Sequence, residues 1–467
     1  MKVKGKIIRT AILCLIAGAS LAGCSKNDEP GDVSVAGVIL SESSKTLSPG
    51  ESFTLTAIVV PDEATNKKLA WTSSRPEVAS VADDGTVSAH SVGEAVITVA
   101  AGSGGKTASC TVTVEESEIS MTAAAGTVNL GVGGSGTATV DWGDGNSETV
   151  ELHDAARDIR HTYAASSNSR RITVRGKRIT ILNCSRNQLT ALDASKSASL
   201  TALSCYENSL TSLDLSRNTG LASLSCHTNQ LTVLDVSKNT ELLYLYCSGN
   251  KLTALMVSEN TKLEQLGCSY NSLNALDVSR NTGLLYLSCS NNSLSALDLG
   301  KNTALTDLSC DNNKLNALDV SKNTGLTYMV CYSNKLNALD VGKNTGLAYL
   351  DCHSNELNAL DVSKNTELIG LSCNSNKLKA LYVGENTGLV RLMCYENNLS
   401  ALDVSKNIGL EFLNCSYNGL SADALNDLFE SLHGNVIPDK SKRIIFYGNP
   451  GADACDRFIA IAKGWDV

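Results

Sequence analysis

Cysteine is the residue type in this chain whose number and spacing most clearly suggest chemistry. Sixteen cysteines are present. Thiols in such numbers could form disulfide bonds, which need Cβ atoms about 3.8 Å apart on converging bonds. They could also bind zinc, which needs four ligands that converge on one point. Twelve of them recur every 21 residues: Cys184, Cys205, Cys226, Cys247, Cys268, Cys289, Cys310, Cys331, Cys352, Cys373, Cys394 and Cys415.

The residues around each of these cysteines predict that the thiols stack in a row. An asparagine lies three residues after each cysteine, and a leucine lies two residues before it, with Met329 as the exception. The alternation of apolar residues predicts a strand with one buried face. Identical strands stacked in register hold equivalent Cβ atoms about 4.8 Å apart and parallel, which suits neither a disulfide nor a zinc site. We therefore expect reduced, buried thiols that act as small apolar side chains, with no metal bound.

One repeat unit runs from Leu200 to Gly220. Its first half has the pattern LxxLxCxxNxL, and its second half, LxxLDLSxNTG, repeats the same spacing. This unit resembles the short nested class of bacterial leucine-rich repeats, in which both halves of the coil carry the pattern. The resemblance covers residues 179–419 and implies a solenoid of about twelve 21-residue coils. The asparagine after each strand is expected to hydrogen-bond backbone groups that would otherwise be buried without partners.

The remaining polar residues do not form a recognisable catalytic set. The six histidines are not at a metal-ligand spacing, and no nucleophile elbow or phosphate-binding loop is present. The aspartates that recur with the coil, such as Asp214 and Asp235, are expected to be architectural. We predict that the protein is not an enzyme and needs no cofactor. A weaker alternative, a carbohydrate-binding protein or hydrolase, depends on Asp307, Asp311 and Asp351 converging on the exposed strand face.

Tyrosine is concentrated on one side of the predicted coils. Ten of the thirteen tyrosines occupy outward positions on the strand or its rim, whereas the second side repeats alanine, aspartate and serine. Tyrosine has a broad surface and a polar tip that suit recognition. The alternative is that tyrosine simply fits exposed strand positions, which would make the protein a structural surface spacer without a specific ligand. The predicted ligand-binding residues are Tyr206, His227, Tyr244, Tyr246, Tyr286, Tyr328, Tyr332, Tyr349, His353 and Tyr395. We predict an adhesin or ligand-capture protein whose partner is a protein or a glycan.

The N-terminal residues predict export and a lipid anchor. Residues 1–23 have a basic start followed by a short apolar run, which is typical of a signal peptide. The stretch Leu21-Ala22-Gly23-Cys24 resembles a bacterial lipobox, which implies cleavage before Cys24 and lipidation of that residue. Residues 24–32 resemble the acidic tether of surface lipoproteins from Bacteroidota-like bacteria, which implies an outer-membrane lipoprotein exposed at the cell surface. A plain signal peptide with an incidental cysteine is the alternative.

Two β-sandwich domains are expected between the tether and the solenoid. Residues 33–116 contain short alternating strands, and motifs such as Trp71-Thr72-Ser73-Ser74 and Asp84-Gly85-Thr86-Val87 resemble the group 2 bacterial immunoglobulin-like domain. Residues 117–178 contain Trp142-Gly143-Asp144-Gly145 and His161-Thr162-Tyr163, which resemble the PKD-type sandwich. That domain is expected to cap the first coil. Its aspartates suggest a structural turn, with a calcium site as the alternative.

The C-terminal residues 420–467 lose the 21-residue period and predict a small α/β cap. Residues 422–432 have helical spacing, 443–447 read as a strand, and a second helix is expected through 456–460. The fold class is therefore mainly β. The formal net charge of −9 becomes more negative once the basic residues of 1–23 are removed. This charge argues against nucleic acid as a partner and against membrane contact other than through the N-terminal lipid.

Overall fold

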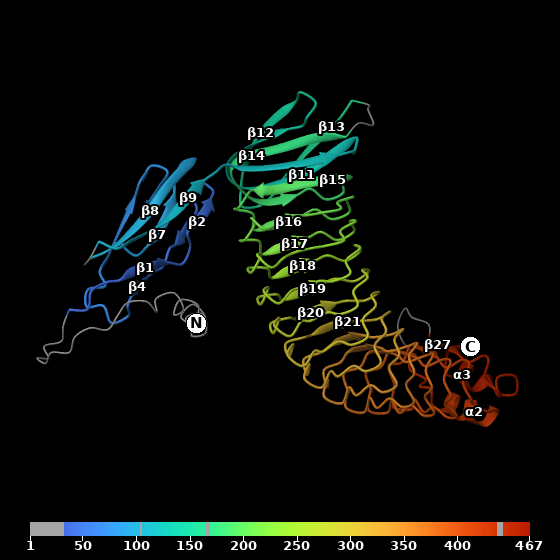
Figure 1. Cartoon of the computed structure of the whole chain (residues 1–467). Coiled ribbons are helices and arrows are strands. Elements are labelled where there is room, and N and C mark those ends of the chain that lie inside the picture. The colour runs from blue at the N-terminus through green and yellow to red at the C-terminus, as the bar shows by residue number, and fades with distance from the viewer. Residues whose placement is uncertain (1–31, 103–104, 165–168, 437–441) are drawn as a thin grey trace, which may run out of the picture.

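The computed structural model describes residues 32–102, 105–164, 169–436 and 442–467. The predicted signal peptide, Cys24 and nearly all of the tether lie outside the described residues. The described chain is mainly β, with an immunoglobulin-like domain followed by a solenoid of about thirteen turns. Figure 1 shows the coils stacked in a curved row. The row lies between the sheet that runs from β11 (Thr127–Asp141) to β15 (Leu189–Lys196) and the helices α2 (Ala422–Ser431) and α3 (Phe458–Ala462).

The N-terminal domain is built from three small sheets around its own core. Leu55, Val87, Ile97 and Cys110 are fully buried in that core, which confirms the predicted sandwich. The sheets are β1 (Gly37–Leu40) with β4 (Ala57–Val60); β2 (Ser44–Leu47), β9 (Thr107–Val114), β8 (Gly93–Ala101) and β5 (Leu69–Ser73); and β3 (Ser52–Thr54), β7 (Thr86–Ala89) and β6 (Ala79–Val81).

The segment before the solenoid is continuous with it. Residues Ile181–Asn183 at the end of β14 (Arg170–Asn183) pair in parallel with β16 (Ala202–Ser204), so the predicted boundary between 178 and 179 lies inside a strand. The cores of the two parts also merge into one cluster. The segment therefore forms the antiparallel start of the solenoid sheet. Its strands are β10 (Ser117–Ala123), β11 (Thr127–Asp141), β12 (Ser147–Leu152), β13 (Arg157–Thr162), β14 (Arg170–Asn183) and β15 (Leu189–Lys196).

Each following coil contributes one strand of three residues to a parallel ladder. The residues that pair are 21 positions apart in every step, and the middle residue of each strand is buried. This register confirms the predicted coil. The strands are β16 (Ala202–Ser204), β17 (Ser223–Ser225), β18 (Tyr244–Tyr246), β19 (Gln265–Gly267), β20 (Tyr286–Ser288), β21 (Asp307–Ser309), β22 (Tyr328–Val330), β23 (Tyr349–Asp351), β24 (Gly370–Ser372), β25 (Arg391–Met393) and β26 (Phe412–Asn414).

The asparagine three residues after each cysteine ties one coil to the next. Asn313 shows the pattern: its Oδ1 accepts from the backbone N–H of Leu294 at 3.0 Å. Its Nδ2 donates to the carbonyl oxygens of Cys289 and Cys310, each at 3.1 Å. The residue before Asn313 has φ of +52°, and the equivalent residue in every coil from Arg186 to Tyr417 also has a positive φ. Only one of them is glycine, so this left-handed turn is held by the side-chain bonds that follow it.

A second row of asparagines supports the side of the coil that has no strand. Each member is fully buried and donates two hydrogen bonds to carbonyl oxygens of preceding coils. Asn302, for example, donates to Val278 and Asn281, each at 2.9 Å. This row was not predicted, although the repeated NTG at the end of each unit is its signal in the sequence. The row contains Asn218, Asn239, Asn260, Asn281, Asn302, Asn323, Asn344, Asn365, Asn386 and Asn407.

The recurring aspartates of the second side close a turn in nine of the coils, as expected for an architectural repeat. Asp319 Oδ1 accepts from the backbone N–H of Ser321 at 2.9 Å. This bond, more than the charge of Lys322, holds the pKa of Asp319 below its ordinary value. The same turn is present at Asp193, Asp214, Asp235, Asp277, Asp298, Asp340, Asp361 and Asp403.

The C-terminal residues form the predicted cap. Helix α2 (Ala422–Ser431) begins after Ser421, whose side chain accepts from the N–H of Ala424, and it buries Leu425, Leu428 and Phe429. Strand β27 (Lys442–Ile445) then adds to the ladder beside β26, followed by α3 (Phe458–Ala462) and β28 (Trp465–Asp466). The cap thus covers the apolar end of the last regular coil.

The ladder cysteines are fully buried, as predicted. All fourteen cysteines in the described residues are free thiols. Burial raises the pKa of the Cys289 thiol to about 12 and raises the pKa of every other thiol in the row. Such thiols are poor nucleophiles at neutral pH, because the thiolate is the reactive form.

We predict that the row is unreactive in the folded protein. Iodoacetamide should alkylate none of Cys205 to Cys394 under native conditions and all of them after denaturation without reductant. Intact-protein mass spectrometry measures both states. Recovery of a disulfide such as Cys247–Cys268 from the denatured, unreduced protein would contradict the prediction.

We also predict that Asn313→Ala costs roughly 2–5 kcal/mol of unfolding free energy, because it leaves a buried N–H and several carbonyl groups without their partner. Asn316→Ala is the matched control, since Asn316 is an exposed residue of the same coil, and it should cost less than about 0.5 kcal/mol. Urea unfolding followed by circular dichroism compares the two. Equal losses in both variants would show that the ladder bond contributes nothing specific.

Candidate ligand-binding face

The outward side chains of the strand ladder form one continuous surface, here called the strand face. It consists of the first and third residues of each three-residue strand and of the residue that follows each ladder cysteine. Because every step of the ladder keeps the same register, these positions align in columns across the coils. The first-position column reads Tyr244, Gln265, Tyr286, Asp307, Tyr328, Tyr349, Gly370, Arg391 and Phe412.

The structure brings most of the predicted binding residues together in three groups. Tyr206 and His227 stack at 4.5 Å near the N-terminal end. Tyr244, Tyr246 and Tyr286 lie in β18 and β20.

The third group comprises Tyr328, Tyr332, Tyr349 and His353. Tyr395 follows two coils after His353 and stacks with none of these residues.

The third group is the most tightly built. The rings of Tyr328 and Tyr349 stack with centroids 5.1 Å apart, and those of Tyr332 and His353 stack at 4.2 Å. Burial raises the pKa of Tyr332, and the nearby carboxylate of Asp311 raises it further. The group therefore combines flat aromatic surface with negative charge.

Two tyrosine rings of the strand face lie against a glycine of the next coil. A Cβ at Gly370 would approach Tyr349 Cδ2 to 2.7 Å, and a Cβ at Gly267 would approach Tyr246 Cδ1 to 3.0 Å. Any larger residue at these positions would push the rings off the neighbouring strand. Gln265 completes the second arrangement by accepting a hydrogen bond from the hydroxyl of Tyr246. These supporting residues were not predicted, although the 21-residue spacing places each glycine opposite its tyrosine.

The three aspartates considered for hydrolysis are held by hydrogen bonds. Asp307 accepts from Thr306 Oγ1 at 2.6 Å, and Asp311 accepts from Ser290 Oγ at 2.5 Å. Asp351 accepts from His353 Nδ1 at 2.6 Å. These contacts fix the carboxylates as acceptors within the face. Across the residues that the structure describes, no three side chains of histidine, cysteine, aspartate or glutamate gather closely enough to hold a metal ion.

The aspartates of the segment 141–145 build a turn, in line with the structural interpretation. Asp144 Oδ1 accepts from the N–H of Asn146 at 3.0 Å, and its Oδ2 lies 2.8 Å from His161 Nε2. The His161 ring stacks on Trp142 with centroids 4.9 Å apart, and the hydroxyl of Tyr163 donates to the carbonyl of Trp142. The hydrogen bond from His161 is the main reason why the pKa of Asp144 falls to about 2.

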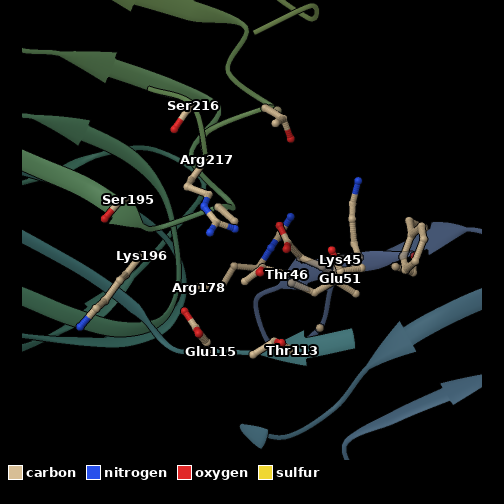
Figure 2. A pocket seen from close by; sticks show the side chains of 18 residues that line it. Lys45, Thr46, Glu51, Thr113, Glu115, Arg178, Ser195, Lys196, Ser216 and Arg217 are labelled. Carbon is tan, nitrogen blue, oxygen red and sulfur yellow. The ribbon is translucent and has the colours of Figure 1, made fainter. Parts of the chain in front are cut away.

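A cleft of about 950 Å³ lies between the immunoglobulin-like domain and the start of the solenoid (Figure 2). Lys45 and Glu51 line it from the domain, and Arg178 and Arg217 line it from the solenoid. Lys45 is already paired with Glu42 at 3.3 Å, and the lining mixes both signs of charge. This cleft is not predictable from the sequence, because it depends on how the domain and the solenoid lie beside each other.

The fold and the strand face define a leucine-rich-repeat solenoid that follows a bacterial immunoglobulin-like domain. Residues 34–112 match the family described as the bacterial Ig-like domain (group 2). An Ig-like virion protein of Serratia phage KSP90 is 46% identical over 83 residues, which are 18% of this chain and 32% of that protein. The chain spans less than a third of that relative, and the next two curated relatives are covered to 9% and 25%.

Solved structures resemble the solenoid. An internalin of Listeria monocytogenes superposes with a TM-score of 0.55 at 20% identity, over 62% of this chain and 86% of that one. This likeness shows the fold. A functional domain of InlJ from Listeria monocytogenes, described as including a cysteine ladder, is 33% identical with a TM-score of 0.44, over 55% of this chain and 74% of that one. Within the part of the chain described here, we find no helix with the length and apolar character needed to cross a bilayer.

The Asp144–His161 pair predicts a pH dependence of stability. The folded pKa of about 2 lies below the ordinary value of 3.8, so the stabilisation is complete above pH 3.8 and is lost as the pH falls through about 2. Asp144→Asn should therefore lower the melting temperature at pH 7, and the gap to the natural protein should close by pH 2. Thermal melts at pH 7, 4, 3 and 2 measure this. Asp154→Asn controls for the loss of one exposed negative charge in the same segment, and a gap that stays constant with pH would contradict the prediction.

Proposed function

We propose that the protein is a non-enzymatic cell-surface binding protein, an adhesin or ligand-capture lipoprotein, that holds a protein partner on the strand face of its solenoid. The observation that carries this proposal is the difference between the two sides of the coil. The second side repeats one turn, in which the aspartate accepts a hydrogen bond from the backbone N–H two residues later. The strand face varies from coil to coil and gathers tyrosine, histidine and aspartate.

The size of the face supports a macromolecular partner. Tyr206 and Tyr395 are nine coils apart, which corresponds to about 43 Å at about 4.8 Å per strand. A surface of that length with several aromatic groups is suited to a broad interface, in which a few anchors carry most of the binding energy. A glycan chain laid along the aromatic rings is the second ligand class for this face, and the experiment below distinguishes the two.

We further infer that the chain is anchored through lipid on Cys24 and displayed at the outer surface of the outer membrane. The support comes from the lipobox-like residues and from the acidic tether of residues 24–32. The immunoglobulin-like domain then acts as a spacer between the anchor and the solenoid. The PKD-like segment extends this spacer and starts the solenoid sheet.

We predict that alanine at Tyr244, Tyr286, Tyr328 and Tyr349 together weakens partner binding at least about tenfold, because aromatic anchors dominate such interfaces. The protein from residue 25 onward is applied to arrays of matrix and surface proteins and to glycan arrays, and the strongest hit is titrated by surface plasmon resonance. The variant should remain folded by circular dichroism, because half-exposed rings contribute little to stability.

Tyr382→Ala is the matched control. Tyr382 is 81% exposed on the second side, so its removal should leave binding unchanged. Equal binding by the fourfold variant and the natural protein would assign the tyrosines to architecture and favour the spacer alternative. Hits confined to the glycan array would replace the protein partner with a carbohydrate.

A further inference from the structure

The middle of the strand face carries aspartates but no lysine or arginine. From Tyr244 to His353 its positions include Asp307, Asp311 and Asp351, and none is lysine or arginine. The lysines and the arginine of these coils are all exposed on other parts of the surface: Lys251, Lys262, Arg280, Lys301, Lys314, Lys322, Lys335 and Lys343. The repeat therefore separates positive charge from this part of the face.

Two of these carboxylates are nearly buried without a fixed positive partner. Asp311 is 5% exposed and Asp351 is 9% exposed. Asp311 accepts from the neutral groups of Ser290 and Asn312 and is also in hydrogen-bond contact with Tyr332, and Asp351 is bonded to His353. In the described part of the chain, neither is paired with lysine or arginine. A buried charge without an opposite charge is costly, and a cation brought by a partner would offset that cost.

The aromatic rings at the two ends of the face already have their own cations. Arg186 lies over the ring of Tyr206 at 5.5 Å, and Arg391 lies over the ring of Phe412 at 4.9 Å. The stacked rings of the middle group have no such arginine or lysine among the described residues. The faces of aromatic rings attract cations. The described part of the chain supplies an arginine for a ring at each end of the strand face but supplies none for the stacked tyrosines between them.

We propose that the partner is a polypeptide that places an arginine or lysine side chain beside Asp311 and Asp351, against the rings of Tyr328, Tyr332 and Tyr349. This inference rests on the proposed function, because it names the chemistry of the partner for the same face. The carboxylates accept the N–H groups of the cation, and the rings cover its flat or methylene surface. The strand face thus selects a basic segment rather than an acidic or neutral one.

The test uses peptides as probes, because the natural partner is unidentified. An array displays 12-residue peptides in pairs that differ only in arginine against citrulline, its neutral isostere. The natural protein from residue 25 onward should bind the arginine member at least about tenfold more strongly for the peptides that it retains. That preference should decline between 50 and 500 mM NaCl, because added salt screens the contact. This comparison depends on no protein variant.

A matched pair of variants then locates the contact. Asp311→Asn with Asp351→Asn should abolish the preference for arginine. Asp319→Asn with Asp361→Asn removes the same charge from the second side of the same two coils, where asparagine can still close the turn, and should leave the preference intact. Circular dichroism confirms that both proteins are folded.

The outcomes separate this inference from the proposed function. Binding of arginine and citrulline peptides with equal strength, lost in the tyrosine variant, would overturn the cationic anchor and leave the binding face in place. Equal loss of preference in both aspartate pairs would show a general charge effect and overturn the inference. Failure to retain any peptide would overturn it as well. The protein and glycan arrays would still decide whether the face binds at all.

Discussion

The structure depends on satisfying backbone groups in a coil that contains very little regular secondary structure. Only three of the 21 residues in each coil belong to a strand, so most N–H and C=O groups need other partners. Backbone hydrogen bonds within and between the coils supply many of these partners, and two rows of asparagine side chains supply others. One row closes the turn after the strand, and the other joins carbonyl groups on the opposite side. Each buried amide left unpaired would cost about 1–3 kcal/mol, which is large beside the marginal stability of a folded domain.

This arrangement of hydrogen bonds explains which positions of the coil tolerate different amino acids. Leucine, valine and cysteine fill an interior only one layer wide, and the asparagines fix both corners, so the interior repeats in every coil. Side chains that point outward from the strand are not members of this apolar cluster. Tyrosine, aspartate and histidine collect at these positions. Residues at these positions can therefore differ from coil to coil with little effect on the stability of the fold.

The coil was predictable from sequence, because each inward position has one requirement that repeats twelve times. The burial of Cys289 and the bonding of Asn313 follow directly from the 21-residue spacing. The sequence identifies which residues lie on the strand face, but it does not show how their side chains pack against one another. Whether Tyr349 lies flat depends on the missing side chain of Gly370, and the burial of Asp311 depends on Ser290 in the preceding coil. The course of β14 through the predicted boundary was also hidden, because residues 170–183 show no change of pattern where antiparallel pairing becomes parallel pairing.

Strand β14 also bears on how the solenoid assembles. A stack of equal coils has a costly nucleus, since no single coil is stable without a neighbour. Here β10 and β11 pair with β14 in antiparallel fashion and order it before any parallel partner is required. Residues Ile181–Asn183 of β14 then form an ordered strand edge with which β16 can pair, and each later coil can pair with the strand before it. Folding can thus propagate in one direction, from the N-terminal sheet toward α2, which is also the order in which a ribosome delivers the chain.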